Sequence, residues 1–323
     1  MVSKLASIAA RGQQWGGKVV RTPSGSQHRI EHGAQRAVVV EVGGGLREYV
    51  VDGFPVVDGY SEADMAVAGR GQLLIPWPNR MADGSYRFDE ETHQVPLNEV
   101  AQHNAIHGLV RWSAWHLIEA SSQDVRLGHV LWPQAGYPFT LALEVLYELS
   151  DLGLRVTLTA ENAGQHRAPY GAGQHPYVRA ELAGVDSCVL RLPAEAWLET
   201  DERQIPTGRL LDVARTDYDF RAPRTIGRTR LDTAFTGLTR DADGIARVEL
   251  ASADGSRQVA MWFDRSFDYV MAFTGDTLEP SARRRSLALE PMTCAPDAFR
   301  NNLGLQVLEP GQRVSASWGV GVS

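Results

Sequence analysis

Short runs of apolar or alternating apolar and polar residues, separated by turn residues, make up most of this chain. Their length, their β-branched side chains and their period of two are typical of β-strands. We find no amphipathic helix longer than about two turns, so the strand–helix alternation of a doubly wound sheet is missing. The sequence therefore predicts an all-β fold, a large antiparallel β-sandwich. The predicted strands are residues 37–42, 47–51, 115–120, 126–131, 140–148, 154–161, 187–192, 246–250, 258–264, 269–274, 286–290 and 312–320.

Glycine-containing breaks between these runs, such as residues 151–153 and 253–255, have the composition of hairpin turns. The polar stretch 201–230 is interpreted as a surface excursion, and no repeat or long linker divides the chain. We therefore predict a single domain over residues 1–323, with about the first 20 residues as a flexible extension.

Composition excludes several classes of function. The 323 residues carry a formal net charge of −7, so the concentrated Lys and Arg of a nucleic-acid surface are lacking. Cys188 and Cys294 are too few for a disulfide framework and are predicted to be reduced core residues. Residues 1–17 are too polar for a secretion signal, and no later stretch approaches the ~20 apolar residues of a membrane span. We expect a cytoplasmic protein that binds neither nucleic acid nor membrane.

One carboxylate and two imidazoles stand in constrained positions. Glu290 follows the apolar run 286–289, where a charge is costly to bury, and Pro291 is predicted to end that strand. His107 lies in Asn-Ala-Ile-His-Gly, and His175 lies in Gly-Ala-Gly-Gln-His-Pro-Tyr. These residues lack the close spacing of metal ligands, and no glycine-rich phosphate loop joins a strand to a helix. The combination indicates acid–base chemistry that needs no metal.

Several motifs, taken together and in this order, resemble the aldose 1-epimerase (mutarotase) family. The resemblance covers about residues 38–320 and implies a galactose mutarotase-like supersandwich with a sugar-binding cleft on one broad sheet. It also implies interconversion of the α and β anomers of a free monosaccharide by ring opening and closure. We expect this reaction to need no cofactor and the protein to be a monomer or homodimer. The motifs are 78–88 (Pro-Asn-Arg-Met-Ala-Asp-Gly-Ser-Tyr-Arg-Phe), 97–98, 106–108 with Trp112, 136–140 with Tyr147, 173–177, 231–232 with Phe235, and 289–291.

The reaction needs one group to take the proton of the anomeric hydroxyl and another to protonate the ring oxygen. Glu290 is the predicted base, because apolar neighbours raise its proton affinity toward the working pH. His175 is the predicted acid, since an imidazole can carry a transferable proton near neutrality. For each residue the alternative is structural: a strand-end Glu held by backbone amides, or a His packed beside a proline.

The remaining site residues are predicted to bind the sugar. Arg80 matches the family's sugar-hydroxyl ligand, and its planar fork of donors can reach two adjacent oxygens. Asn79 is expected to hold the Arg80 loop, His107 to hydrogen-bond the ring oxygen or a nearby hydroxyl, and Asp232 to accept from hydroxyls. One aromatic side chain is expected to stack on the sugar. The candidates are Trp77, Trp112, Tyr137 and Tyr177.

Some residues depart from the family pattern and leave alternatives open. Gln174 precedes the second histidine, where Asn is usual, Thr233 follows Asp232, and Phe139 follows Gly-Tyr-Pro. One alternative is a non-catalytic carbohydrate-binding protein on the same scaffold, because fold does not fix function. Another is a hexose-6-phosphate 1-epimerase, which would need several arginines at one end of the cleft. The run Arg283-Arg284-Arg285 invites that interpretation but is better explained as an exposed hairpin tip.

Overall fold

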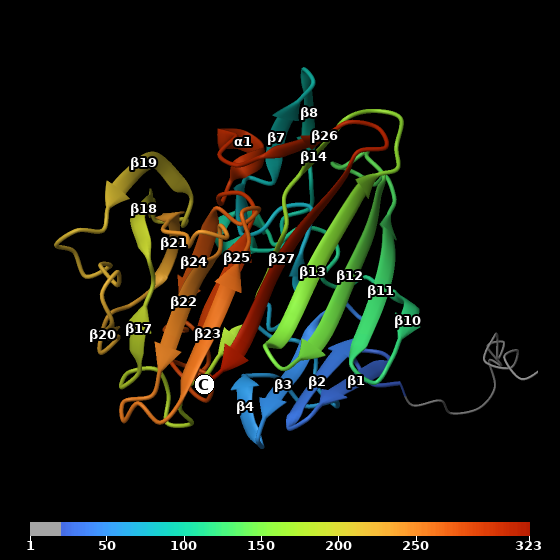
Figure 1. Cartoon of the computed structure of the whole chain (residues 1–323). Helices are drawn as coiled ribbons and strands as arrows, with labels where there is room; N and C mark the ends of the chain where they lie inside the picture. The colour runs from blue at the N-terminus through green and yellow to red at the C-terminus, as the bar shows by residue number, and fades with distance from the viewer. Residues whose placement is uncertain (1–20) are drawn as a thin grey trace, which may run out of the picture.

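The computed structural model describes residues 21–323, and nearly all of its regular structure is strand (Figure 1). Strand makes up 49% of the chain and helix 2%, which confirms the predicted all-β fold. The helical elements are α1 (Ala298–Asn301) and the 3-10 turn η1 (Val100–Gln102). Across residues 21–323 no helix is both long and apolar enough to span a membrane. The extension predicted for the first 20 residues lies outside the described residues.

Two large antiparallel sheets form the body of the molecule, and three two-stranded sheets flank them. The 12-stranded sheet contains, in spatial order, β1 (Gln27–His32), β2 (Gln35–Val40), β3 (Leu46–Val51), β4 (Phe54–Val57), β16 (Tyr177–Val178), β25 (Leu287–Met292), β24 (Tyr269–Phe273), β21 (Asp232–Leu238), β18 (Ala194–Thr200) and β19 (Pro206–Asp212), while β15 (Gly173–Gln174) joins β25 to β5 (Leu73–Leu74).

The nine-stranded sheet contains β10 (His116–Ala120), β11 (Asp124–Leu131), β12 (Leu141–Ser150), β13 (Gly153–Asn162), β27 (Arg313–Val322), β23 (Gln258–Phe263), β22 (Ala246–Ala251), β17 (Val189–Arg191) and β20 (Arg224–Thr225). The small sheets pair β14 (Ala168–Tyr170) with β26 (Gln306–Leu308), β6 (Arg80–Ala82) with β9 (Asn104–Ile106), and β7 (Ser85–Phe88) with β8 (Glu91–Gln94).

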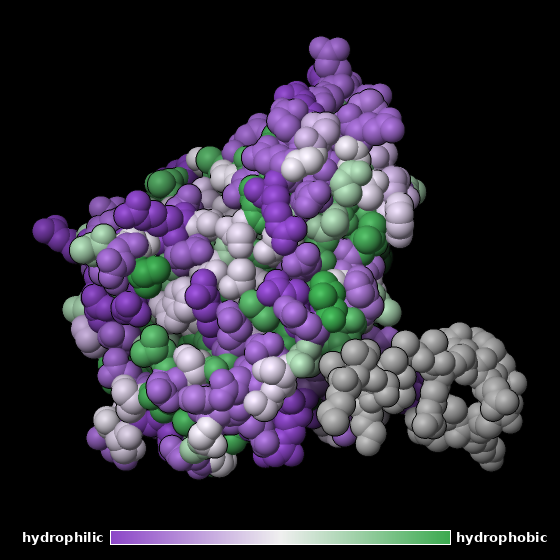
Figure 2. All heavy atoms as spheres, turned by 45° about the vertical axis from the view of Figure 1, so that its right-hand side comes forward, coloured by the Kyte–Doolittle hydropathy of each residue, from purple (hydrophilic) through white to green (hydrophobic). Residues whose placement is uncertain are grey.

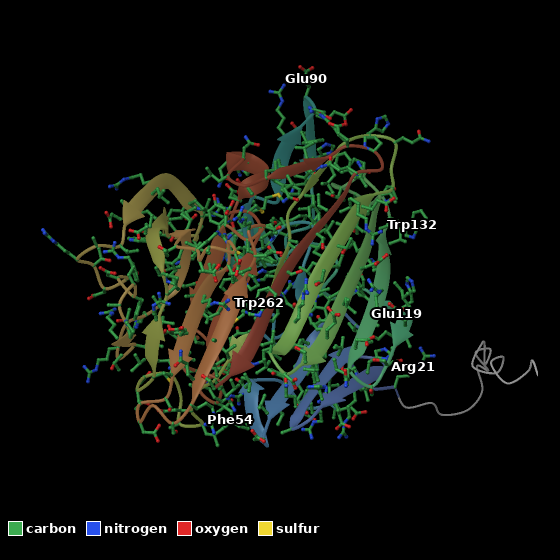
Figure 3. All side chains as sticks on the ribbon, viewed as in Figure 1. Arg21, Phe54, Glu90, Glu119, Trp132 and Trp262 are labelled. Atoms are coloured by element: carbon green, nitrogen blue, oxygen red, sulfur yellow. The ribbon has the colours of Figure 1, made fainter. Side chains whose placement is uncertain are left out.

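Alternation along the strands builds one core between the two large sheets. In β12, every second residue from Leu141 to Leu149 is buried, and the residues between them are partly exposed. On the outer face of the nine-stranded sheet, Trp262 of β23 lies across Gly319 of β27, where a Cβ would come within 2.3 Å of the indole (Figure 3). The face in Figure 2 is mostly polar with apolar side chains scattered over it, as expected for a solvent-facing surface.

Two local predictions were wrong. The stretch 201–230 is not only a surface excursion, because it contains β19 and β20; β19 is an edge strand with mostly exposed residues, so it lacks an apolar alternation. Pro291 does not end its strand, since β25 continues to Met292. Leu289 and Thr293 donate to the neighbouring segment, and Pro291 falls between them as the position without an N–H to donate.

Candidate active site

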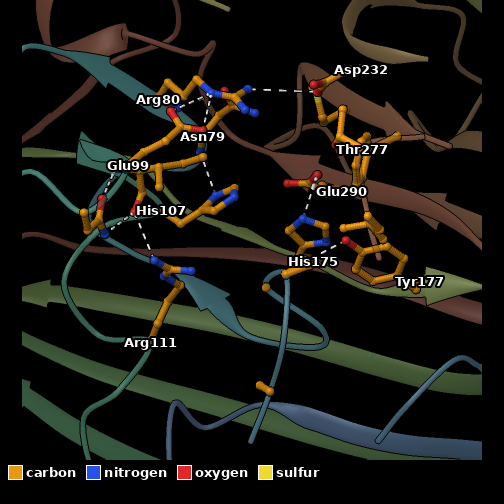
Figure 4. Close-up of a pocket in the computed structure, with 18 of the residues that line it drawn as sticks. Asn79, Arg80, Glu99, His107, Arg111, His175, Tyr177, Asp232, Thr277 and Glu290 are labelled. Atoms are coloured by element: carbon orange, nitrogen blue, oxygen red, sulfur yellow. Dashed lines mark hydrogen bonds and ion pairs between the residues drawn. The ribbon is translucent and has the colours of Figure 1, made fainter. Parts of the chain in front are cut away.

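A cleft of about 330 Å³ lies on the 12-stranded sheet, and its floor comes from neighbouring strands (Figure 4). In β25, Leu289 belongs to the main core, so the period of two turns Glu290 to the opposite face. Strand register then places Met271 of β24 beside Glu290, and Phe273 beside Asp232 of β21. The sheet thus brings Glu290 and Asp232 into one cleft although 58 positions separate them in the sequence.

The same alternation explains the second histidine motif. Gln174 is fully buried toward the core, where it donates to the Tyr147 hydroxyl (2.8 Å) and accepts from Trp318 Nε1 (3.1 Å). His175 and Tyr177 lie on the other face and line the cleft. Gln174, the residue that differs from the usual Asn of the family, therefore lies in the interior of the sandwich. Of the two neighbours, only His175 faces the cleft.

The opposite wall comes from the small sheet of β6 and β9. His107 N–H donates to the Asn79 carbonyl (2.9 Å), and Asn79 N–H donates back to His107 Nδ1 (3.1 Å). Both residues have positive φ, 57° for Asn79 and 65° for His107, a conformation that non-glycine residues rarely adopt. Such strained residues cluster at functional sites. Asn79 Oδ1 also accepts from Arg80 N–H (2.8 Å), so the Asn79 side chain turns back on its own loop.

The bond from Asn79 fixes the tautomer of His107. Because Nδ1 accepts a backbone N–H, the hydrogen of the neutral ring must be on Nε2. Protonating Nδ1 would break this bond. Burial, followed by the nearby His175, Arg111 and Arg80, holds the pKa of His107 well below its ordinary value. His107 is therefore a neutral hydrogen-bond donor through Nε2–H, suited to a sugar oxygen.

Glu290 and His175 form a buried pair at the centre of the cleft. Glu290 Oε1 lies 3.2 Å from His175 Nε2, and their side chains are 2% and 6% exposed. Burial, with the nearby Asp232 adding to it, raises the pKa of Glu290 well above its ordinary value. Burial also lowers the pKa of His175, and Arg111 and Arg70 act in the same direction. In the sugar-free cleft both groups therefore favour their neutral forms.

The second oxygen of the Glu290 carboxyl group is available to hydrogen-bond a ligand. Glu290 Oε2 is buried and has no hydrogen-bond partner among residues 21–323. An unpaired buried carboxyl oxygen is destabilising unless a ligand satisfies it. Since Glu290 lines the cleft, this oxygen can take a hydrogen bond from a bound hydroxyl group.

Arg80 is held between two carboxylates rather than projecting freely. Its Nε donates to Glu99 Oε2 (2.9 Å) and Oε1 (3.1 Å), and its Nη1 lies 3.9 Å from Asp232 Oδ1. Burial raises the pKa of Asp232 while Arg80 opposes the rise. The pair thus offers a fixed donor next to a fixed acceptor, the arrangement that recognises neighbouring hydroxyl groups.

A metal site can be tested against the same residues. One ligand atom each from His107, His175 and Glu290 lies within 4.8 Å of the others, although their sequence spacing had argued against a metal. The spacing of these residues along the chain therefore does not tell whether they could bind a metal ion. Metal-binding histidines usually donate their second ring N–H to an acceptor, whereas His107 uses Nδ1 to accept, which leaves a hydrogen on Nε2. The donor set fits a polyhydroxy ligand better than a cation.

The predicted aromatic platforms fall in different places. Trp77 and Tyr137 are buried against Phe299, outside the cleft. Tyr177 lines the cleft but is only 1% exposed, and its ring stacks on His175 at 4.8 Å. Trp112 lines the cleft and is 52% exposed, so its indole has the most free surface of the four.

Several cleft residues were missed by the sequence analysis. Glu99 and Arg111 line the wall, Phe273 and Thr277 line the floor side, and Gly69 contributes from the loop before β5. None has a distinctive sequence context, although Glu99 directly follows the motif 97–98. Phe273 reaches the site through the register of β24, Glu99 through its bridge to Asn104 and its ion pair with Arg80, and Gly69 through its contact with His175.

The Arg283–Arg285 run is engaged elsewhere. Arg284 binds Asp186 (2.6 Å) and Asp276 (3.0 Å), and Arg285 binds Asp58 (2.9 Å). Arg283 donates to the Leu278 carbonyl at 3.3 Å. None of these arginines lines the cleft, so the run supplies no phosphate site there.

Known proteins are similar to this chain in sequence and in fold. A family model described as "Aldose 1-epimerase" matches residues 26–320. The chain belongs to the aldose 1-epimerase family. This confirms the resemblance seen in the motifs of the sequence.

The relatives of this chain differ in whether their names state an activity. The chain is 35% identical to the uncharacterized protein YihR of Escherichia coli K12, over 90% of this chain and 91% of that protein. It is 27% identical to the maltose epimerase of Levilactobacillus brevis, over 75% and 76%. It is 28% identical to human galactose mutarotase, over 58% and 55%.

Solved structures agree on the fold. The aldose epimerase homologue from C. elegans superposes with a TM-score of 0.81 at 17% identity, covering 92% of this chain and 99% of that one. A putative aldose 1-epimerase from Escherichia coli K12 gives 0.80 at 19% identity, with the same coverage. These similarities establish the galactose mutarotase-like sandwich for this chain.

Proposed function

We propose that this family member is an aldose 1-epimerase that interconverts the α and β anomers of a free aldose. The observation that carries the proposal is the buried Glu290–His175 pair, 3.2 Å apart, with one carboxyl oxygen left unpaired among residues 21–323. A cleft that only bound sugar would not need two buried titratable groups in contact, since burying them is unfavourable. The family membership supports the reaction class.

The pair contains the protons that the reaction moves. A carboxylic acid beside a neutral imidazole holds as many protons as a carboxylate beside an imidazolium, and one proton crossing from Glu290 to His175 converts the first form into the second. Glu290 then takes the proton of the anomeric O1–H while His175 gives its proton to the ring oxygen O5. The C1–O5 bond breaks, leaving an aldehyde at C1 and a hydroxyl on C5.

Closure reverses these transfers on the other face of the aldehyde. Rotation about the C1–C2 bond presents that face to the C5 hydroxyl, whose oxygen attacks C1. His175 takes back the hydroxyl proton and Glu290 returns one to O1, so atoms and protons balance. The neutral Nε2–H of His107 donates to a sugar oxygen in this cycle and itself transfers no proton.

The remaining cleft residues bind the sugar. Arg80 and Asp232 hold adjacent hydroxyl groups, with Asn79 fixing the Arg80 loop. Trp112 offers an apolar face for the ring. Tyr177 contributes mainly through its contact with His175, because its own ring is almost wholly buried.

Polarimetry tests the proposal directly. Freshly dissolved α-glucose, α-galactose and α-maltose should each be followed with and without the protein; we expect faster approach to rotational equilibrium for at least one of them. The protein should retain this activity after treatment with a chelator, because no step requires a cation. Binding of these sugars without any acceleration would favour a non-catalytic carbohydrate-binding protein. Loss of activity in the chelator, restored by a divalent cation, would contradict the metal-free mechanism.

A further inference from the structure

The segment 68–72, which belongs to none of the sequence motifs, packs against His175 and hydrogen-bonds to its backbone. Gly71 N–H donates to the His175 carbonyl (2.9 Å), and His175 N–H donates to the Gln72 carbonyl (3.1 Å). Gly69 has φ +76°, and a Cβ there would come within 2.6 Å of His175 Cδ2. The backbone of this segment therefore lies directly against the imidazole ring.

The same segment reaches His175 a second time, through Tyr177. The Tyr177 and His175 rings are stacked, with centroids 4.8 Å apart and planes 13° apart. The guanidinium carbon of Arg70 lies 4.4 Å from the centroid of the Tyr177 ring, within the range of a cation–π contact. The Tyr177 hydroxyl donates to the Ala68 carbonyl (2.9 Å). Arg70, Tyr177 and His175 form a continuous series of contacts that ends at Glu290.

A buried ion cluster fixes Arg70. Arg70 Nη2 lies 3.2 Å from Asp58 Oδ2, and both side chains are almost fully buried. Arg179 (2.7 Å) and Arg285 (2.9 Å) bind the same carboxylate, and the Ser286 hydroxyl donates to it (2.8 Å). Burial alone would raise the pKa of Asp58, but these partners outweigh it and lower the pKa, so the carboxylate stays charged. One carboxylate facing three guanidinium groups leaves excess positive charge behind the cleft.

We propose that Arg70 is a positioning residue for the acid–base pair: through Tyr177 it fixes the His175 ring against Glu290. The inference rests on the proposed mutarotation, because it assigns Arg70 a part in that reaction. A displacement of about 1 Å in such a pair can lower a rate by roughly 100-fold.

The charge environment gives the direction of the expected effect. Burial is the main cause of the low pKa of His175, and the positive charges of Arg111 and Arg70 add to it. Removing the charge of Arg70 should therefore make His175 easier to protonate. The other titratable or charged groups that face the ring are Glu290, His107, Arg111 and Tyr177.

Two substitutions at the same carboxylate separate positioning from stability. Arg70→Met and Arg179→Met each remove one guanidinium from Asp58, but the cation over the Tyr177 ring is Arg70. We expect Arg70→Met to lower kcat by at least roughly 10-fold with KM little changed. Its kcat–pH profile should also shift to higher pH relative to Arg179→Met. Arg179→Met should lose a similar amount of thermal stability yet keep the wild-type profile.

Imidazole ¹⁵N NMR of the same proteins provides a readout that does not depend on activity, with His175→Asn used to assign the signal. The His175 ring should begin to titrate at higher pH in Arg70→Met than in Arg179→Met. This shift in the titration of His175 would support the role of Arg70 even if the protein did not accelerate mutarotation. A lack of mutarotation would overturn only the proposed function. Identical titrations and identical kcat–pH profiles in the two variants would overturn the role of Arg70.

Variants at Tyr177 keep the test valid if Arg70→Met fails to fold. Tyr177→Leu removes the stacked ring but leaves the Arg70–Asp58 pair, so it should reproduce the fall in kcat of Arg70→Met without the shift in the pH profile, because the charge of Arg70 remains. Tyr177→Phe keeps the ring and loses only the hydrogen bond to Ala68, so it should lose less of kcat than Tyr177→Leu. In the Tyr177→Leu background, Arg70→Met should lower kcat little further, since Arg70 positions His175 through the ring. A wild-type kcat for Tyr177→Leu would rule the inference out.

Discussion

Glu290 is the residue whose chemistry the cleft changes most. Gln has nearly the same volume and can still hydrogen-bond, so Glu290→Gln should fold and bind sugar but lack the base. We expect kcat to fall by at least roughly 100-fold with little change in KM, as for a group that acts mainly in the transition state. Polarimetric rates over a range of sugar concentrations measure both constants.

His175→Asn is the companion variant. It should show a similar fall in kcat, and the double variant should lose less than the product of the two single losses, because either change already interrupts the same proton transfer. Near-normal mutarotation by Glu290→Gln would remove Glu290 from the mechanism and favour a sugar-binding protein.

Burial of Glu290 also predicts a pH-dependent effect on folding. Its folded-state pKa is raised above the ordinary value of 4.5, so the unfolded protein gives up this proton first as the pH rises. The resulting contribution to stability is full below about pH 4.5 and is lost as the pH rises toward the folded-state pKa. A pKa difference of one corresponds to about 1.4 kcal/mol.

Glu290→Gln removes this titration, so its stability relative to the wild type should increase as the pH rises from about 4.5 toward the folded-state pKa. Urea unfolding of both proteins across that range measures the difference in free energy of unfolding. A constant difference at every pH would mean that the pKa of Glu290 is close to its value in the unfolded chain.

At the scale of elements, the loop before β5 lies directly against His175, one of the two residues of the proposed acid–base pair. Gly69→Ala would push a methyl group against the His175 ring, where a Cβ meets Cδ2 at 2.6 Å. We expect kcat to fall by roughly 10-fold or more, because the ring must move relative to Glu290. Kinetic constants measured by polarimetry, together with thermal unfolding, test this prediction.

Gly53→Ala provides a matched control. Gly53 has φ +78°, close to the +76° of Gly69, but no atom lies within 4 Å of its added Cβ. Both variants should lose about 1–2 kcal/mol of stability from the left-handed conformation, while only Gly69→Ala should lose activity. Equal activity in the two variants would mean that the loop tolerates a displaced His175.

For the whole molecule, the shared core predicts one folding unit. A single cluster of buried side chains includes Val39 of the 12-stranded sheet and Val145 and Trp318 of the nine-stranded sheet. The buried Gln174 joins the sheets further, through Tyr147 and Trp318. Since neither sheet can cover its apolar face alone, we propose a single domain that unfolds in one cooperative transition.

Far-UV circular dichroism reports the strands, and tryptophan fluorescence reports the core. The two unfolding curves in urea should coincide, with Gln174→Leu shifting both to lower urea concentration because Tyr147 and Trp318 lose their shared partner. Two separated transitions would indicate that the sheets fold independently.

The period of two in the sequence was enough to predict the fold class and many of the longer strands, although not β1, β18 or β21, because it records which side of each strand meets the core. The same period turned Glu290 and His175 toward the cleft, and the ordered motifs identified the family. Apolar alternation and the position of proline failed to predict β19 and the end of β25, because both depend on which neighbouring strands are present. The edge strand β19 has mostly exposed residues and so no apolar alternation, and Pro291 is tolerated in β25 because its missing N–H falls at a gap in the hydrogen bonding.

Tertiary structure alone decided the state of the site. The reciprocal bonds of Asn79 fix His107 as a neutral donor, and the burial of Glu290 against His175 favours the neutral forms of both. Arg70 and Gly69 come to His175 from a loop that no motif marks. Sequence determines which side chains are available and which face each strand residue takes. Distances, desolvation and charge between remote segments exist only after the two sheets and their loops have packed together, and these quantities set the proton affinities at the centre of the cleft.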